Sequence, residues 1–326
     1  MIKYTAVIIN YNCLSMIKAC IDSVIEQTFK PIEIRIVDSA SKDGSAELIK
    51  KEFAGLKLLF SKENIGFSKA VNNGIYGAEG EYLLVLNSDV VLDRFFMENI
   101  LKKAMLESAD AGIFCGKLLK YHNNGIVDSE GQFLSRVLKP KERGYLNKDT
   151  SAFSYGRVFS ACGAAVVYKR SMIQEVSENG QLLDEDFFMY FDDLDLGWRA
   201  NTLGWKVFYV PEARAIHARG GSERGERKLL AGKYAFARKP VETRRRILAN
   251  RYYVLIKNCP LSLLLLQFPF IVIYELAVLC YIVFSDFRSL AAYYYVFKDF
   301  NKMAEKRRKI FSLKKFSSKE LSKWII

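Results

Sequence analysis

The chain contains 326 residues, of which 50% are hydrophobic, and this is enough apolar material for one large or two ordinary domains. A mainly disordered protein is therefore excluded. The formal net charge of +13 is unevenly distributed, because residues 222–326 contain 22 Lys and Arg against 8 Asp and Glu, whereas residues 1–221 contain 27 against 28. The basic excess lies in the C-terminal third and indicates a polyanionic or membrane partner for that part.

The six cysteines are scattered along the chain and form no CxxC pair, which argues against a disulfide framework and a structural zinc site. We therefore expect a reducing compartment. The apolar run within residues 1–10 is too short for a secretory signal peptide and is typical of a strand. From this we expect the first part of the protein to lie in the cytoplasm.

Short apolar runs alternate with helical patterns in the N-terminal part of the chain. The runs cover residues 6–9, 32–37 and 82–86, and the helical patterns cover 14–27 and 46–53. Such runs are typical of strands buried on both faces, and their alternation with helices predicts a parallel α/β sheet. Polar segments follow the three runs, at residues 10–12, 38–45 and 87–89. Because ligands bind at the carboxyl ends of strands in such sheets, we expect these segments to converge.

The middle of the chain, residues 112–220, is less regular, with candidate strands at 164–168 and 206–210. Between these strands lies an acidic and aromatic segment, Asp184–Asp195, which contains six carboxylates and four aromatic residues. Burial among aromatic side chains and crowding of like charges raise the pKa of a carboxylate toward that of a general base. A solvated acidic face is the structural alternative, but we expect fewer aromatic residues in such a face.

Two aspartates after the second predicted strand have both a functional and a structural interpretation. Asp38 is placed to accept hydrogen bonds from a base or a sugar, although a strand-end Asp is often only a helix cap. Asp43 is as well explained by a cap for the helix that starts near Ala46 as by a functional role.

Two further polar groups have the chemistry of a diphosphate site. Mg²⁺ usually takes one or two carboxylates, so a single Asp in Asn87-Ser-Asp89 suffices if the substrate supplies a diphosphate, although this tripeptide is also a common turn. His217 precedes Ala-Arg-Gly-Gly-Ser222, and glycine-rich turns let backbone amides approach phosphate. A lone histidine is ordinarily structural, and the neighbouring residues are what favour a functional interpretation here.

A nearly uninterrupted apolar run covers residues 261–284, which as a helix would be about 36 Å long and thus long enough to cross a hydrocarbon core of about 30 Å. Both flanks are basic, and residues 285–326 contain 11 Lys and Arg against 4 Asp and Glu. The positive-inside rule therefore favours the cytoplasmic side for both flanks. Both flanks lie on the cytoplasmic side if the segment forms a re-entrant hairpin bent at Pro269, or if the helices lie in the membrane interface. A buried core helix of a soluble domain is the alternative.

In their order along residues 5–222, several motifs resemble those of the family 2 glycosyltransferases, especially the rhamnosyltransferase-like branch that builds bacterial surface polysaccharides. The most specific is Asn64-Ile-Gly-Phe-Ser-Lys-Ala-Val-Asn-Asn-Gly74. The others are Val7-Ile-Ile-Asn-Tyr-Asn12, Val37-Asp-Ser-Ala-Ser-Lys-Asp-Gly-Ser45, Asn87-Ser-Asp89 at the D-x-D position, Phe188-Met-Tyr-Phe-Asp-Asp-Leu-Asp-Leu-Gly-Trp-Arg199 and His217-Ala-Arg-Gly-Gly-Ser222. The chain departs from the family pattern at Ser39, which replaces Asn, and at Asp192, which replaces Glu.

The resemblance implies a GT-A fold, which is a Rossmann-like α/β fold with a mostly parallel central sheet. It also implies that Asp38 recognises a pyrimidine base and that Asp89, with His217, holds Mg²⁺ or Mn²⁺ on the diphosphate. Asp193 matches the general base for an inverting attack, and Asp192 is the competing candidate. The other residues implied in nucleotide-sugar binding are Asn10, Asn12, Asn64, Gly66, Asn72, Asn87, Ser88 and Ser222.

The resemblance further implies the substrates. Processive synthases of this fold typically have a Q-x-x-R-W motif and several membrane spans, and the chain has neither, so a transferase that adds a single sugar is expected. The donor implied is dTDP-rhamnose or a UDP-sugar, and the acceptor implied is a saccharide linked to polyprenyl diphosphate. We expect a catalytic GT-A domain over residues 1–222 and a basic, apolar helical region over 223–326. This region would associate with the cytoplasmic face of the cell membrane, peripherally or in the membrane plane, through residues 240–326.

Two rival interpretations come from other classes of protein. The first is a non-catalytic protein with an α/β core whose basic tail binds a membrane or nucleic acid. Because an apolar run divides the basic flanks, lipid is favoured over nucleic acid, and we expect no nucleic-acid partner. The second is a nucleotidyltransferase, which usually needs a basic phosphate-binding loop near the first strand, whereas residues 10–14 contain no Lys, Arg or Gly.

Overall fold

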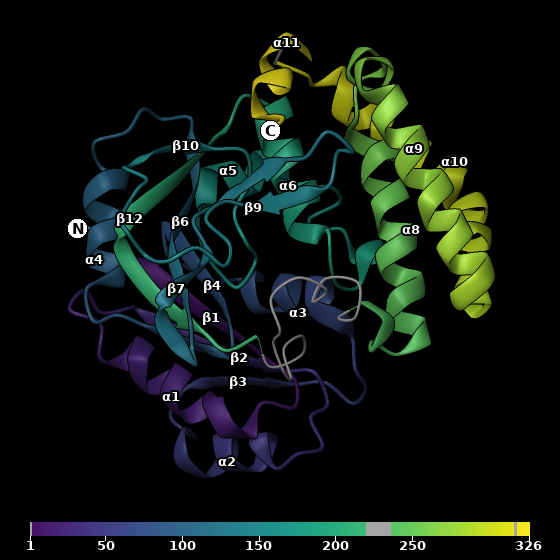
Figure 1. Cartoon of the computed structure of the whole chain (residues 1–326). Coiled ribbons are helices and arrows are strands. Elements are labelled where there is room, and N and C mark those ends of the chain that lie inside the picture. The colour runs from purple at the N-terminus through teal and green to yellow at the C-terminus, as the bar shows by residue number, and fades with distance from the viewer. Residues whose placement is uncertain (1, 220–235, 316–317) are drawn as a thin grey trace.

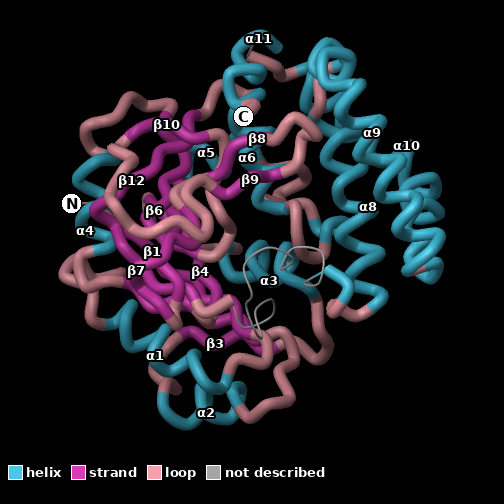
Figure 2. The backbone as a smooth tube through the Cα atoms, viewed as in Figure 1, coloured by secondary structure: helices cyan, strands magenta, loops and turns pink. Residues whose placement is uncertain are grey.

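The computed structural model describes residues 2–219, 236–315 and 318–326, and its main feature is a mixed β-sheet covered by helices on both faces (Figures 1 and 2). The strands of this sheet are β1 Tyr4–Asn10, β2 Glu33–Asp38, β3 Lys57–Phe60, β4 Tyr82–Asn87, β5 Val90–Leu92, β6 Ala111–Lys120, β7 Asn123–Ser129, β10 Gly156–Val158, β11 Ala165–Lys169 and β12 Lys206–His217. Their order is β10-β12-β6-β11-β4-β1-β2-β3, with β5 paired to β12 and β7 paired to β6.

The two faces of the sheet are covered by different helices. The alternating residues Ala6 and Ile8 of β1 pack in one core, and Val7 and Ile9 pack in another. The first core includes residues of α1 (Leu14–Ile25), α2 (Ser45–Glu52) and α4 (Phe96–Ala104), and the second includes residues of α3 (Gly66–Ile75), α5 (Arg170–Val176) and α6 (Asp192–Thr202). The predicted burial of the first strands on both faces is therefore confirmed.

The expectation of a mostly parallel sheet holds for part of it. Strands β3, β2, β1 and β4 are parallel, and β6 is parallel to β12. Strand β11 runs antiparallel between β4 and β6, so the sheet as a whole is mixed. A parallel neighbour requires a crossover connection, usually a helix. Within the described residues only strands and loops lie between β6 and β11, which explains why β11 runs antiparallel.

The C-terminal region forms helices that stand side by side next to the sheet (Figure 1). They are α8 Val241–Asn258, α9 Leu261–Ser285 and α10 Ala291–Ser312, and the short α11 Ser318–Leu321 follows them near the C-terminus. The predicted hairpin bent at Pro269 is wrong, because α9 continues through this residue. A proline inside a helix removes one backbone hydrogen bond and often kinks the helix without ending it. The alternative of helices in the membrane interface remains.

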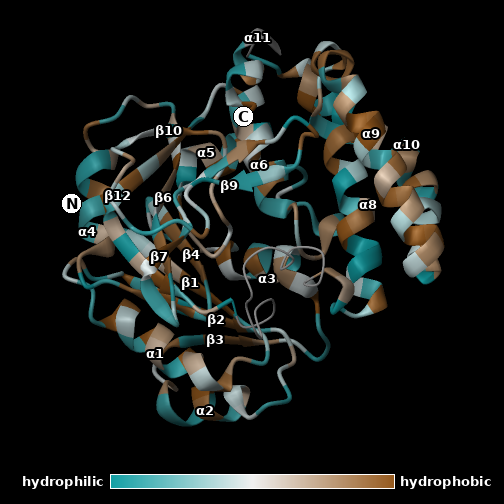
Figure 3. Ribbon diagram, viewed as in Figure 1, coloured by the Kyte–Doolittle hydropathy of each residue, from teal (hydrophilic) through white to brown (hydrophobic). Residues whose placement is uncertain are grey.

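Helix α9 is apolar along most of its length (Figure 3), and it packs on the protein along one stripe. Leu263, Gln267 and Ile271, spaced four residues apart, lie on the buried stripe. Only 11% of its most apolar window is buried, so α9 is not the core helix of the soluble-domain alternative. Within the described residues it is the one helix with the length and composition to cross a membrane.

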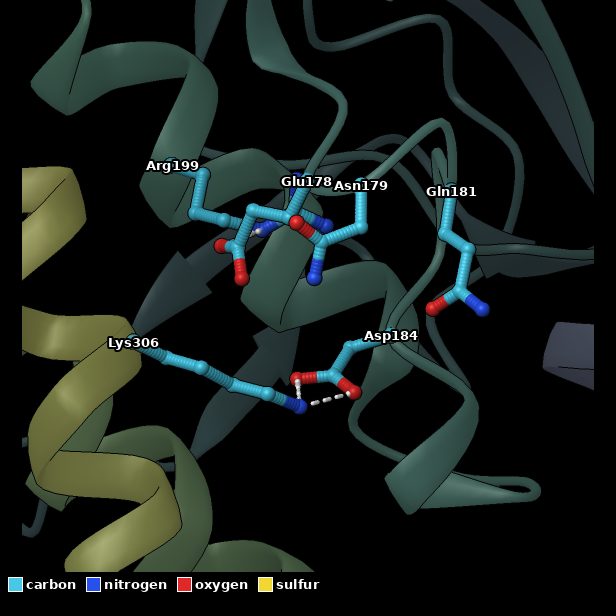
Figure 4. A pocket seen from close by; sticks show the side chains of 6 residues that line it. All are labelled: Glu178, Asn179, Gln181, Asp184, Arg199 and Lys306. Atoms are coloured by element: carbon cyan, nitrogen blue, oxygen red, sulfur yellow. Dashed lines mark hydrogen bonds and ion pairs between the residues drawn. The ribbon is translucent and has the colours of Figure 1, made fainter.

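Helices α8 and α10 pack against the acidic segment that was predicted from the sequence. The Nζ atom of Lys257, on α8, is fully buried and lies 2.8 Å from Asp184 Oδ2 and 3.1 Å from Asp195 Oδ2. Lys306, on α10, contacts Asp184 at 2.6 Å (Figure 4). Burial alone would raise the pKa of Asp184, but these two lysines hold it well below the usual range. The predicted boundary near residue 222 therefore separates two regions that are joined by buried ion pairs.

Replacing Lys257 with Met should destabilise the protein strongly. The substitution removes the fully buried cation that lies between Asp184 and Asp195, so that Asp184 keeps Lys306 and Asp195 keeps Arg199. Breaking a buried ion pair in this way typically costs about 3–5 kcal/mol. The matched control is Lys309→Ala on α10, which removes an exposed cation paired with Glu305 and should cost at most about 1 kcal/mol. The measurement is the free energy of unfolding in detergent solution, and equal values for both variants would contradict this account of α8.

Candidate active site

The polar ends of the first strands meet at one edge of the sheet, as predicted. Asn10 lies opposite Asp38 in the register of β1 and β2, and Ile9 lies opposite Asn87 in β4. The side-chain amide of Asn10 donates to Asp38 Oδ2 at 2.7 Å and to Ser45 Oγ at 2.9 Å. These bonds hold the loop after β2 against the end of β1.

The loop that follows β2 is ordered by two further predicted residues. Asp43 accepts hydrogen bonds from the backbone amides of Leu14 and Ser45, at 2.7 and 3.1 Å, so it joins the first residues of α1 and α2. Asp43 therefore has a structural role at both helix starts, although the N-cap position of α2 is occupied by Gly44 and not by Asp43. Asn12 accepts a bond of 2.7 Å from the backbone amide of Lys42. Its predicted contact with a nucleotide sugar stays a prediction.

Asp89, His217 and Asp128 form a chain of polar contacts at the same edge. His217 Nε2 lies 3.5 Å from Asp89 Oδ1, and His217 Nδ1 lies 2.8 Å from Asp128 Oδ2. Arg219 Nε donates to the other oxygen of Asp128 at 2.5 Å. The backbone amide of Ala218 donates to the carbonyl oxygen of Asp89. The end of β12 is therefore tied to the turn after β4, and the two predicted metal ligands are brought together.

The donor atoms of this group fit a divalent cation that also binds a diphosphate. Metal-binding histidines commonly donate their second ring nitrogen to a carboxylate, and Asp128 occupies that position for His217. Burial disfavours the imidazolium, but the bonds with Asp128 and Asp89 outweigh burial and raise the pKa of His217 to about 9. Within the described residues, no group of three or more His, Cys, Asp and Glu is placed to hold a metal ion. The remaining ligands would therefore be phosphate and water oxygens.

The acidic segment enters α6 through a strained turn. Phe188, Tyr190 and Phe191 have φ values of 60°, 68° and 66°, in a region that costs roughly 1–3 kcal/mol for a residue with a side chain. The side-chain amide of Asn250, on α8, donates to the carbonyl oxygens of Phe187 and Tyr190 at 2.8 and 2.9 Å. The C-terminal helices thus stabilise the turn that precedes the two candidate bases.

The most specific motif of the sequence packs against this turn. Gly66 has a φ of 77°, and a Cβ atom there would lie 2.5 Å from the ring of Phe188, so a larger residue does not fit. Asn72 donates to the carbonyl oxygen of Leu183 at 2.8 Å and accepts from its amide at 3.0 Å. Asn64 accepts a bond of 3.0 Å from the amide of Gly66. The structure shows that these residues support the acidic segment, and their predicted role in nucleotide-sugar binding stays a prediction.

Asp192 and Asp193 are the first two residues of α6, and their environments differ. Asp192 is 4% exposed, and burial followed by the negative charge of Asp193 raises its pKa well above the usual range. Burial also raises the pKa of Asp193, but hydrogen bonds to its carboxylate oppose this rise. These bonds come from the Gln132 side chain at 2.8 Å, the Gly163 amide at 3.2 Å and the Leu194 amide at 2.8 Å. Asp193 is therefore the carboxylate that ionises first.

Sequence reasoning missed a second acidic group beside Asp193. The side-chain amide of Gln132 bridges Asp193 Oδ2 at 2.8 Å and Glu142 Oε1 at 2.9 Å. Burial raises the pKa of Glu142 to about 7, against the opposing effects of Arg219 and of hydrogen bonds from Ser129 and Gln132. The sequence signal for Asp128, Gln132 and Glu142 is weak, because they lie on short strands in the irregular middle of the chain.

The turn at residues 162–164 connects the two parts of the site. The backbone amide of Asn87 donates to the carbonyl oxygen of Ala164 at 2.9 Å, and the amide of Gly163 donates to Asp193. Ser88 is held at the same edge by a bond from its amide to Ile9. The predicted nucleotide-side strand ends and the candidate base therefore border one turn. Ser222 lies outside the described residues.

Similar folds are found in two solved structures. The crystal structure of GalNAc-T7 with UDP, GalNAc and Mn²⁺ matches with a TM-score of 0.56 and 15% identity, over 79% of this chain and 48% of that chain. The mannosyltransferase PcManGT from Pyrobaculum calidifontis, in complex with GDP-Man and Mn²⁺, matches with a TM-score of 0.53 and 16% identity, over 95% and 85% of the two chains. At these identities the likeness shows the fold alone, and the fold is that of the GT-A glycosyltransferases.

The family follows from the sequence comparison. The model described as Glycosyl transferase family 2 matches residues 5–177, more than half of the chain, so the chain belongs to this family. The glycosyltransferase GlyA of Streptococcus pneumoniae is 32% identical over 68% of this chain, which spans 31% of that relative's length. The N-acetylglucosaminyl-diphospho-decaprenol L-rhamnosyltransferase of Mycobacterium tuberculosis is 25% identical over 60% of this chain and 69% of its own. The predicted family and fold are confirmed.

The raised pKa of Glu142 predicts a pH dependence of stability. The pKa of Glu142 is about 7 in the folded state and about 4.5 in the unfolded state. The protonated carboxyl therefore contributes stability that is fully present below pH 4.5 and is lost as the pH rises to 7. Glu142→Gln should remove this loss. The free energy of unfolding of the variant relative to the wild type should therefore rise by up to about 3 kcal/mol from pH 5 to pH 8. Chemical unfolding at both pH values measures it, and a difference that does not change with pH would contradict the assignment.

Proposed function

We propose that this protein is an inverting, metal-dependent glycosyltransferase that moves one sugar from a nucleoside-diphosphate sugar to a lipid-linked saccharide, in cell-surface polysaccharide synthesis. The observation that supports this most directly is that Asn87, two residues before Asp89, and Asp193 both form hydrogen bonds with the turn at residues 162–164. The pair of Asp89 and His217 has the chemistry to bind a cation, and Asp193 has the chemistry of a base. A metal-dependent inverting transfer of a sugar from a diphosphate uses both groups.

The environment of the two candidate bases favours Asp193. A general base must be ionised when the acceptor arrives. The three hydrogen bonds to Asp193 favour its ionised form, whereas Asp192 has a more strongly raised pKa and keeps its proton to higher pH. Asp193 accepts the proton of the acceptor hydroxyl as the hydroxyl oxygen bonds to the anomeric carbon. The bond from that carbon to the diphosphate oxygen breaks, and attack from the opposite face inverts the configuration.

The departing nucleoside diphosphate carries charge that a bound Mg²⁺ or Mn²⁺ offsets. Asp89 and His217 would hold this ion, and Asp128 keeps the His217 ring in one orientation. Asp38, at the end of β2, would recognise the base. The donor is dTDP-rhamnose or a UDP-sugar. Rhamnose is supported by the name of the mycobacterial relative, and a nucleotide sugar with a divalent ion is supported by the contents of the two similar structures.

The proposed location is the cytoplasmic face of the cell membrane, with α9 lying in the membrane plane. The large exposed apolar residues on this helix include Leu265, Leu266, Phe268, Ile273, Leu276 and Phe284. Its middle, however, is tied to polar groups, since Glu275 pairs with Arg251 and the Tyr274 hydroxyl lies 3.0 Å from Lys139 Nζ. A helix that crossed the bilayer would carry these groups to its centre, where charge is costly. A helix in the interface keeps them at the surface.

The proposed function is tested by measuring donor binding and sugar transfer with a panel of nucleotide sugars. Each measurement is made with and without EDTA. The wild type should bind at least one donor, and EDTA should weaken this binding. If the wild-type protein binds none of the nucleotide sugars, the proposed function is wrong.

Asp193→Asn should lower the rate of transfer by about 100-fold or more and leave donor binding unchanged, because it removes the base alone. The matched control is Asp186→Asn in the same segment, whose carboxylate pairs with Lys302 and Lys306 and should matter little for the rate. Burial raises the pKa of Asp193, so wild-type activity should fall with decreasing pH at values above the ordinary aspartate pKa of about 4. A rate for Asp193→Asn equal to that of the control would contradict its role as the base.

Asp128→Asn should weaken the response to Mn²⁺. The change removes the carboxylate that orients His217, and loss of such a partner typically costs 10–100-fold in metal affinity. The measurement is the Mn²⁺ concentration that gives half-maximal donor binding. Asp149→Asn serves as the control, because Asp149 pairs with Lys117 and Arg214, each at 2.7 Å. An unchanged Mn²⁺ requirement in Asp128→Asn would remove Asp128 from the proposed site.

A further inference from the structure

A short β-hairpin connects the candidate base with the apolar helix α9. It consists of β8 (Gln132–Leu134) and β9 (Pro140–Glu142), which pair in register with Gln132 opposite Glu142 and Leu134 opposite Pro140. At one end, Gln132 donates to Asp193. Figure 2 shows the hairpin beside α6, between the sheet and the C-terminal helices. Its other end, the loop of residues 135–139, contacts α9.

This loop presents two cationic side chains on the surface of α9. The guanidinium of exposed Arg136 lies 4.8 Å from the ring centroid of Phe270, and Lys139 Nζ lies 5.0 Å from that of Tyr274. We call Arg136 and Lys139 the hairpin cations. In the described part of the chain, no acidic side chain lies within ion-pair distance of Arg136 or Lys139.

A third cation, Arg251 on α8, supports the loop of residues 135–139 through a hydrogen bond to its backbone. Arg251 is 4% exposed and donates from Nη2 to the carbonyl oxygen of Val137 at 2.9 Å. Glu275 on α9 pairs with Arg251 and accepts from the hydroxyl of Tyr252, so the charge of Glu275 is already compensated. The hairpin cations therefore keep a net positive charge, although they lie beside an apolar helix.

The apolar face of α9 continues from the hairpin cations. Leu266, Phe270 and Ile273 are spaced four and three residues apart, so they lie on one side of the helix. All three are exposed, at 61%, 39% and 69%. A cationic pair next to an exposed apolar stripe is complementary to an amphiphile whose head is anionic and whose tail is hydrocarbon.

The spacing between the hairpin cations and the base is set by the hairpin. Arg136 follows Gln132 by four residues, and because the chain is extended over β8 and turns at residues 135–139, the two residues are separated by at most roughly 13 Å, at about 3.3 Å per residue. This length accommodates a sugar ring followed by a diphosphate. An acceptor that bound along the hairpin would thus place its sugar near Asp193, its diphosphate near the hairpin cations and its hydrocarbon chain on α9.

We propose that Arg136 and Lys139 form a binding site for the diphosphate of a prenyl diphosphate-linked acceptor, with α9 as the support for its hydrocarbon chain. This inference rests on the proposed function and names the place of its acceptor. The hairpin then sets the distance between the diphosphate of the acceptor and the hydroxyl that reacts. It selects acceptors in which the saccharide between them is short.

The test uses the full chain in detergent with EDTA, so that a diphosphate does not bind through a cation at Asp89. Binding of farnesyl diphosphate, farnesol and inorganic pyrophosphate is measured by calorimetry. Farnesyl diphosphate should bind more tightly than either of the other two, because only it engages both the cations and the apolar face. Absence of farnesyl diphosphate binding to the wild type would overturn the proposal.

Arg136→Ala with Lys139→Ala should weaken farnesyl diphosphate binding about tenfold or more, and Arg136→Lys with Lys139→Arg should retain most of it. The matched control is Lys141→Ala with Lys148→Ala, which removes two exposed cations from the same part of the chain. Thermal unfolding of all variants shows whether they fold. Equal binding by the alanine variant and the control would overturn the proposal.

Vesicles that contain phosphatidylglycerol distinguish the acceptor from ordinary lipid headgroups. If the alanine variant loses vesicle binding but binds farnesyl diphosphate like the wild type, the two residues contact the membrane and the proposal is wrong. Donor binding with Mn²⁺ is measured on the same preparations. A wild type that binds no nucleotide sugar overturns the proposed function, whereas normal donor binding with unaltered prenyl diphosphate binding in the alanine variant overturns the acceptor site alone.

Discussion

The arrangement of the site depends on charge compensation between the acidic segment and the C-terminal helices. Asp184 and Asp195 are both buried, and an unpaired carboxylate in such a position costs several kcal/mol. Lys257 from α8 lies between these two carboxylates, and Arg199 Nε donates to Asp195 at 2.8 Å within α6. Because these pairs cross from one region to the other, the acidic segment keeps its conformation only while α8 is packed against it.

The same packing stabilises the strained turn that leads to the candidate base. The turn contains three residues with positive φ between positions 188 and 191. On one side, Asn250 donates to carbonyl oxygens of the turn. On the other side α3 packs against it, and Gly66 leaves space for Phe188. The C-terminal region thus has a structural role in addition to the membrane contact that we propose for it. Any shift of α8 relative to the sheet would reach Asp193 through this turn, so the proposed membrane contact and the candidate base are linked by one structural element.

The sequence predicted well the features that depend on local pattern. The first strands and the polar residues at their ends were found because unbroken apolar runs mark strands buried on both faces. Strand β6 was missed because Lys117 and Lys120 interrupt its apolar pattern, although both are buried. Asp128 and Gln132 were missed for another reason. Their partners His217 and Asp193 are 89 and 61 residues away, and pairs so far apart along the chain leave no local sequence pattern.

By itself the sequence determined the alternation of the first strands and helices, the convergence of Asn10, Asp38 and Asn87 at one edge, and the apolar character of α9, since each follows from residue type and spacing. Only the tertiary structure decided that Asp193 rather than Asp192 is the better ionised carboxylate and that Asn72 supports the acidic segment. It also decided that α9 continues through Pro269. The physical reason is that ionisation and hydrogen-bond pairing depend on burial and on charges brought together through space, which neighbouring residues in the chain do not specify.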